Sequence, residues 1–128
     1  MVVDEKQLTE DILRLAATDV RRCMQCGRCS ANCAAALNMD LLPHRVVWEL
    51  NNGHASELLA AESPWKCLSC MACVERCPRG VEPGKLVEAV RLVSIRRKGE
   101  NHLLADSIPS LVDEDLPGQA LVTAFRKY

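Results

Sequence analysis

Aromatic side chains are scarce in this 128-residue chain, in which phenylalanine, tryptophan and tyrosine together make up 3% of the sequence. Such rings normally supply much of the area that a protein core buries. Hydrophobic content is an ordinary 48%, and the length suits a single compact domain. We therefore expect one core, with something other than aromatic packing helping to organise it.

Long apolar runs and excess positive charge are also lacking. No stretch of about 18 consecutive apolar residues occurs, and no apolar signal segment follows the charged residues Asp4, Glu5 and Lys6. We expect neither a membrane span nor secretion, and a cytoplasmic location. Sixteen Lys and Arg against 17 Asp and Glu give a formal charge of -1. Because nucleic-acid binding usually needs a basic excess, no nucleic-acid partner is expected.

Cysteine, in contrast, is abundant, with eight residues in the chain. Cytosolic thiols are kept reduced, so this number indicates that the cysteines bind something. They follow the pattern C-x2-C-x2-C-x3-C twice, and each position of the second copy lies 44 residues after its counterpart in the first. The two copies are Cys23, Cys26, Cys29 and Cys33, then Cys67, Cys70, Cys73 and Cys77.

This spacing is that of bacterial ferredoxins with two [4Fe-4S] clusters. In such proteins three cysteines of one motif bind one cluster, and the fourth reaches the other cluster. The duplicated motif makes this crossover possible, so we predict two [4Fe-4S] clusters. The predicted ligands are Cys23, Cys26, Cys29 and Cys77 for the first cluster, and Cys67, Cys70, Cys73 and Cys33 for the second.

Three other interpretations of the cysteines remain open at this point. A disulfide framework suits the even count, although no export signal accompanies it and closely spaced triplets are poorly placed to pair locally. Zinc sites use separated C-x2-C pairs around one tetrahedral ion, and a third cysteine at the same interval suits a cube better. A single cluster with one decayed motif would lack a ligand, yet all eight positions are filled.

The rest of the chain predicts helices, and no run of alternating apolar and polar residues predicts a strand. The expected helices cover residues 7–21; a segment from Pro43 to a stop at Asn52-Gly53; residues 56–62, closed by Pro64; and a longer segment from Pro83, with Gly99 as its cap. The apolar residues placed on their buried faces are Leu8, Ile12, Leu15, Val20, Val46, Val47, Leu50, Leu86, Val90 and Val93.

The duplication extends beyond the cysteines. Residues 43–50 and 83–90 align, with Arg45 matching Lys85 and the apolar positions coinciding. The repeat unit is therefore a cysteine loop followed by a helix, and we predict an all-α ferredoxin domain at residues 1–98. Residues 99–128 are predicted to form a tail ending in one more helix and to dock on a partner. The tail residues behind this expectation are Leu111, Val112, Asp115, Leu116, Pro117, Leu121, Val122 and Phe125.

Two segments carry a family resemblance. Cys-Met-Gln-Cys-Gly-Arg-Cys-Ser-Ala-Asn-Cys (23–33) and Trp-Lys-Cys-Leu-Ser-Cys-Met-Ala-Cys-Val-Glu-Arg-Cys-Pro-Arg-Gly-Val (65–81) resemble the C subunit of heterodisulfide reductase. The resemblance covers about residues 8–98, and more weakly 116–128. It implies an α-helical ferredoxin that passes electrons from a flavin-containing A-like subunit to a disulfide-reducing B-like subunit.

Electron transfer is the only chemistry that the sequence indicates. It has no glycine-rich phosphate loop and no nucleophile with a histidine and carboxylate at a known spacing, so we expect no substrate site in this chain alone. The leading hypothesis is an electron-transfer subunit of a heterodisulfide-reductase-type complex. The alternatives are a free two-cluster ferredoxin, a subunit of a related quinone-linked or sulfur-oxidising complex, and a redox-sensing or structural cluster protein.

Cationic residues crowd the cysteine loops, where each either raises the reduction potential of an anionic cluster or is an ordinary solvated surface residue. They are Arg21, Arg22, Arg28, Lys66, Arg76 and Arg79. Trp65 stands two residues before Cys67, where it could pack in the core or shield a cluster from water. His44, His54 and His102 have no ligand spacing among themselves and are expected at the surface or at helix caps.

Overall fold

The computed structural model describes residues 4–95 and 117–120. The chain divides into two units, Met1–Ile95 and Arg96–Tyr128. The described part contains helices and no β-strand, which confirms the all-α fold class. None of the helices described is long and apolar enough to cross a bilayer.

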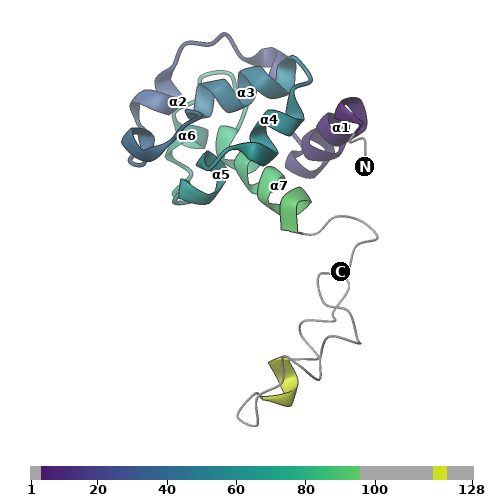
Figure 1. Ribbon diagram of the computed structural model, residues 1–128. Helices are drawn as coiled ribbons and strands as arrows, with labels where there is room; N and C mark the ends of the chain where they lie inside the picture. The colour runs from purple at the N-terminus through teal and green to yellow at the C-terminus, as the bar shows by residue number, and fades with distance from the viewer. Residues whose placement is uncertain (1–3, 96–116, 121–128) are drawn as a thin grey trace. The chain divides into compact units, whose positions relative to one another are not determined.

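The long helices of the first unit are separated by shorter ones, several of them very short (Figure 1). They are α1 (Glu5–Ala16), η1 (Val20–Arg22), α2 (Arg28–Ala31), η2 (Ala36–Asn38), α3 (Pro43–Asn51), α4 (Ala55–Ala60), α5 (Ser63–Lys66), α6 (Ala72–Glu75) and α7 (Pro83–Ile95). The short ones are single turns, too brief to show a helical repeat in the sequence. Figure 1 shows α2 and α6 together at one end of this unit and α1 at the other.

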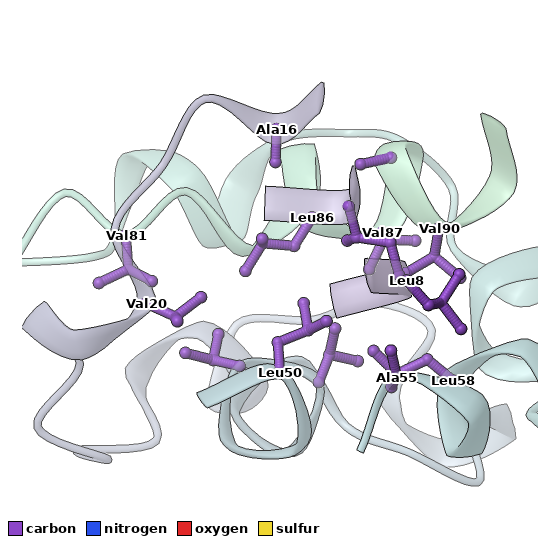
Figure 2. Close-up of a cluster of buried hydrophobic side chains, with 14 residues drawn as sticks. Leu8, Ala16, Val20, Leu50, Ala55, Leu58, Val81, Leu86, Val87 and Val90 are labelled. Atoms are coloured by element: carbon purple, nitrogen blue, oxygen red, sulfur yellow. The ribbon is translucent and has the colours of Figure 1, made fainter. Parts of the chain in front are cut away.

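The core lies between α1, α3, α4 and α7 and is aliphatic in the described residues. Leu8 of α1, Leu50 of α3 and Leu58 of α4 meet Leu86 of α7, and Leu50 and Leu86 point toward each other (Figure 2). Leu15, predicted on the buried face, is wrong as a core residue because its side chain is 48% exposed. The aromatic-poor composition thus corresponds to a core of small branched side chains, with little buried area per residue.

Helix α1 is shorter than predicted, because it ends at Ala16 instead of reaching residue 21. Ala17 adopts the left-handed conformation (φ 51°) and turns the chain out of the helix. The hydroxyl of Thr18 then donates to the carbonyl oxygen of Val81 at 2.6 Å. This bond ties the segment before the first cysteine motif to the segment after the second, a contact that helical periodicity cannot reveal.

Proline stands in the first turn of three helices in this unit. Helix α3 begins at Pro43 and stops before Asn52-Gly53, as predicted, and α7 begins at Pro83 as predicted. Pro64 does not close the preceding helix: α4 has already ended at Ala60, and Pro64 lies in the first turn of α5. The fixed φ and missing N–H of proline suit a first helical turn, which explains this correction.

Some predictions fall outside the described residues. These are the C-terminal cap at Gly99, the boundary between residues 98 and 99, and most of the predicted last helix, including Leu121 and Phe125. In the second unit the structure describes a helical turn at residues 118–120, where the N–H of Ala120 donates to the carbonyl of Pro117 at 2.8 Å.

Candidate iron-sulfur centres

The two cysteine loops have the same backbone course. Gln25 and Ser69, 44 residues apart, both adopt positive φ (54° and 52°), and so do Gly27 and Met71 (76° and 58°). Short helices α2 and α6 start directly afterwards and carry the third cysteine of each motif. Because left-handed backbone is costly for side chains other than glycine, three such residues indicate loops held by their surroundings.

The cysteines line two small cavities of equal size, about 20 Å³ each. Each cavity is lined by three cysteines of one motif and the fourth cysteine of the other. The first contains Cys23, Cys26, Cys29 and Cys77, and the second contains Cys67, Cys70, Cys73 and Cys33. These groupings match the predicted ligand sets, while ligation itself stays a prediction.

The donor set fits a cluster better than a single ion. All eight cysteines are free thiols, and thiolates are the ligands of Fe–S clusters. Among the residues described, no three His, Cys, Asp or Glu side chains are placed to bind one common metal ion. The four thiols of each set instead line the wall of a shared space.

The two cavities lie next to each other. Helix α2, which carries Cys29, packs against α6, which carries Cys73. Burial raises the pKa of the Cys73 thiol to about 11, with smaller contributions from neighbouring Cys67 and from Cys29 of the other set. Burial also raises the pKa of Cys29. Without iron these two thiols are therefore protonated at neutral pH, and metal binding would displace their protons.

Comparison with known proteins shows what this chain is similar to. Residues 19–81 match the family described as "4Fe-4S dicluster domain". The chain is 32% identical to a protein of Archaeoglobus profundus that is named for its likeness to the C subunit of heterodisulfide reductase, over 85% of this chain and 58% of that protein. It is 30% identical to the C subunit of the ferredoxin:CoB-CoM heterodisulfide reductase of Methanosarcina mazei over 67% and 53%. The chain is a relative of the heterodisulfide reductase C subunits.

A third relative gives the same result. The C subunit of the H(2):CoB-CoM heterodisulfide,ferredoxin reductase of Methanothermobacter thermautotrophicus is 30% identical over 69% of this chain and 46% of that protein. The chain thus spans about half the length of these curated relatives. The match to the dicluster family covers residues 19–81, which contain all eight cysteines.

The first cavity of the dicluster domain is rich in hydrogen-bond donors. The side-chain amide of Gln25 donates to the Cys23 sulfur at 3.3 Å and is also within 3.1 Å of the His44 carbonyl oxygen. The backbone N–H of Gln25 donates to the same sulfur at 3.4 Å. On the other side of the cavity, the N–H of Val81 donates to the Cys77 sulfur at 3.4 Å.

His44, expected at the surface or at a cap, lines this first cavity. Its Nδ1 is 2.7 Å from the hydroxyl of Ser30, and that hydroxyl accepts from the His44 backbone N–H at 3.1 Å. His44 therefore holds the end of α2 beside Cys29. The sequence signal that could have found it is its place one residue after Pro43, at the start of the first repeat helix.

The second cavity has small and apolar walls. Gly84, at the start of α7, lies so close that an added Cβ would be 2.8 Å from the Met71 sulfur and 3.3 Å from the Cys73 sulfur. The sulfur of Met39 is 3.9 Å from that of Cys33. Gly84 matches His44 in the aligned repeat helices, so the two cavities differ at an equivalent position.

Two groups of polar contacts hold the second loop from behind. Arg91 of α7 donates to the Pro64 carbonyl at 2.5 Å, to the Ser69 hydroxyl at 2.8 Å and to the carbonyl of Cys67. The Asp40 carboxylate accepts from the N–H of Ser63 at 2.8 Å and from its hydroxyl. Its hydrogen bonds, led by that from the Ser63 side chain, lower the pKa of Asp40 to about 2.

The predicted cations and Trp65 take different positions. Of the cations, Arg28 and Arg79 line the first cavity. Arg21 pairs with Asp19 at 3.0 Å and Lys66 pairs with Glu62 at 2.6 Å. Trp65 is 53% exposed, so it is not a core residue, and it lines neither of the cysteine cavities.

Proposed function

We propose that this chain is the C-like electron-transfer subunit of a heterodisulfide-reductase-type complex. In this proposal it holds two [4Fe-4S] clusters and relays single electrons between a flavin-containing A-like subunit and a disulfide-reducing B-like subunit. The proposed ligands are Cys23, Cys26, Cys29 and Cys77 for the first cluster, and Cys67, Cys70, Cys73 and Cys33 for the second.

The observation that carries this proposal is the crossed grouping of the cysteines around two adjacent cavities. Each bound cluster would supply a one-electron couple. The chain's own contribution is to present four thiolates per site, to bury Cys29 in the first site and to keep the two sites adjacent by packing α2 against α6. A pair of adjacent one-electron sites suits relay between two partner subunits.

The cluster content and the complex can be tested together. Anaerobically purified protein is expected to contain about eight irons and about eight acid-labile sulfides per chain, as two cubes require. Purification from the native host is expected to yield stoichiometric flavin-containing and disulfide-reducing subunits. Zinc as the dominant metal would contradict the clusters, and a lone monomer with full iron content would favour a free ferredoxin.

The crossed ligation has a matched pair of tests. Cys77→Ser is expected to alter the electron paramagnetic resonance signal of the cluster held by the first motif, and Cys33→Ser that of the cluster held by the second. The marker variants Cys26→Ser and Cys70→Ser, at exposed and equivalent positions, identify which signal belongs to which motif. A Cys77→Ser effect confined to the signal that Cys70→Ser alters would reject the crossover.

We also propose that the tail docks on a neighbouring subunit. The unit Met1–Ile95 already contains all eight cysteines and the described aliphatic core, so an element outside the repeats has no evident place in that core. Deleting residues 111–128 is expected to leave iron content unchanged and to weaken association in co-purification. Loss of iron from the truncated protein would show that the tail belongs to the cluster domain.

A further inference from the structure

The two cysteine sets share one backbone geometry but have different electrostatic surroundings. Reduction adds a negative charge to a group that is already anionic. N–H donors to the cysteine sulfurs and nearby cations therefore stabilise the reduced state and raise the reduction potential. A comparison of donors and charges around the two cavities consequently predicts which site holds its electron more tightly.

The first set receives more hydrogen bonds at sulfur. Cys23 accepts from both the backbone and the side-chain amide of Gln25, at 3.4 and 3.3 Å, and Cys77 accepts from the N–H of Val81 at 3.4 Å. For the second set, the corresponding contribution among the described residues is the backbone amide of Gly84 beside Cys73.

Fixed charge differs in the same direction. Arg28 and Arg79 line the first cavity, and neither pairs with a carboxylate within the described part of the chain. The start of α3, with His44, also lies at the first cavity, whereas the start of α7 is shared, because Pro83 lines the first cavity and Gly84 the second; helix starts carry partial positive charge.

The second cavity has no charged residue in its lining, as far as the described residues show. Its nearest cation in the hydrogen-bond network is Arg91, which reaches the loop through the carbonyl of Cys67 and the hydroxyl of Ser69. The second loop therefore has one guanidinium, that of Arg91, behind it, whereas two arginines, Arg28 and Arg79, line the first cavity. At the position of Gln25 the second loop has Ser69, whose hydroxyl accepts from Arg91.

We propose that the first cysteine set holds the higher-potential cluster and that Gln25 raises this potential by donating to Cys23. This inference rests on the proposed function, because it requires both clusters. Within the chain, one electron would leave the reduced site of Cys67, Cys70, Cys73 and Cys33 and enter the oxidised site of Cys23, Cys26, Cys29 and Cys77. The first site gains the electron that the second loses, so the second would be the entry site and the first the exit site.

The test is a redox titration of the full holo-protein followed by electron paramagnetic resonance. Cys26→Ser and Cys70→Ser assign the two signals to the first and second set. The higher midpoint potential is expected for the signal that Cys26→Ser alters. Gln25→Glu, which replaces the donating amide by a carboxylate, is expected to shift that midpoint to more negative values and to leave the other in place.

Further variants separate hydrogen bonding from charge and from folding. Gln25→Met keeps an unbranched side chain but removes the donor, so a smaller negative shift of the same midpoint is expected. Arg28→Gln is expected to shift it in the same direction, which keeps the inference testable if the Gln25 variants do not load iron. The matched control is Arg14→Gln on α1, an exposed arginine paired with Asp11 at 2.8 Å, which is expected to move neither midpoint.

Two outcomes, each with both clusters present, would overturn the inference without affecting the proposed function. One is a higher midpoint potential for the signal that Cys70→Ser alters. The other is an unchanged midpoint potential of the first-set signal in both Gln25→Glu and Arg28→Gln. Iron near four per chain in the unmodified protein would instead overturn the proposed two clusters, and this inference with them.

Discussion

At the scale of single residues, equivalent positions in the two repeats have diverged where they face the cavities. His44 and Gly84 each follow the proline that begins a repeat helix and each lines one cavity, but glycine brings no side chain to that position. The reason at Gly84 is steric, because Met71, Val74 and Cys73 occupy the space that a Cβ would need.

Gly84→Ala is therefore expected to disturb the second site and spare the first. The added methyl would lie 2.8 Å from the Met71 sulfur and 3.3 Å from that of Cys73, so it would displace the loop that presents a proposed ligand. Iron is expected to fall from about eight toward about four per chain, with the first-set resonance signal retained. Gly53→Ala is the control: its φ of 76° makes alanine strained, but the surrounding space is open.

Asp40 anchors the second loop through a carboxylate, and its pKa of about 2 defines a pH dependence. A folded-state pKa below the ordinary 3.8 stabilises the protein fully above about pH 4, and the contribution is lost as the pH falls through 2. Asp40→Asn is expected to lower stability by about 1 kcal/mol, by the same amount at pH 5 and pH 8. Denaturant midpoints, followed by cluster absorbance, would measure this. A difference that shrank between pH 8 and pH 5 would assign the effect to another group.

At the scale of elements, the long helices form the core and the single-turn helices present the cysteines. Cys23, Cys67 and Cys77 pack against the aliphatic core formed by α1, α3, α4 and α7. The loops therefore depend on this core for their positions, even though their own residues are mostly exposed or half-buried.

The dependence of the cysteine loops on the core can be tested by replacing leucine with alanine at one buried and one exposed position. Leu50→Ala, in the core, is expected to cost about 2–5 kcal/mol because it leaves a cavity among close-packed side chains. Leu37→Ala, at a leucine that is fully exposed, is expected to change stability by less than about 0.5 kcal/mol. Thermal loss of cluster absorbance compares the two. Equal losses would contradict the assignment of Leu50 to a core that supports both sites.

At the scale of the whole molecule, the aliphatic core is small, and the two cysteine motifs, far apart in the sequence, meet beside it. Residues of the first and second motifs line each cavity jointly, so two bound clusters would link distant parts of the chain. The described core contains no aromatic ring and so buries less area per residue, and bound metal groups commonly supply the missing stability in such domains.

Removal of the clusters is therefore expected to unfold most of the first unit. Anaerobic protein treated with an iron chelator should lose most of its far-ultraviolet helical circular dichroism together with its visible absorbance. Reconstitution with iron and sulfide should restore both signals. An iron-free sample that retained its full helical signal would show that the aliphatic core is sufficient by itself.

The sequence by itself determined the features that depend on neighbouring residues. The cysteine spacing, the repeat, the absence of strand patterns, and the helix starts at Pro43 and Pro83 are all local, because proline fixes its own φ and lacks the N–H that a helix interior needs. The family resemblance was carried by the same local motifs. Single-turn helices such as α2 and α6 escaped prediction, because four residues show no period.

Only the tertiary structure decided which groups meet across the chain. The end of α1 at Ala16, the exposure of Leu15 and the place of Pro64 at the start of α5 depend on packing and on long-range bonds such as that from Thr18 to Val81. The different linings of the two cavities were also decided by the tertiary structure. The repeat makes the two loops alike in backbone, but Arg28 of α2 and Arg79 after the second motif give the first cavity positive charges, whereas no charged residue is found in the described lining of the second. A linear pattern does not encode these contacts.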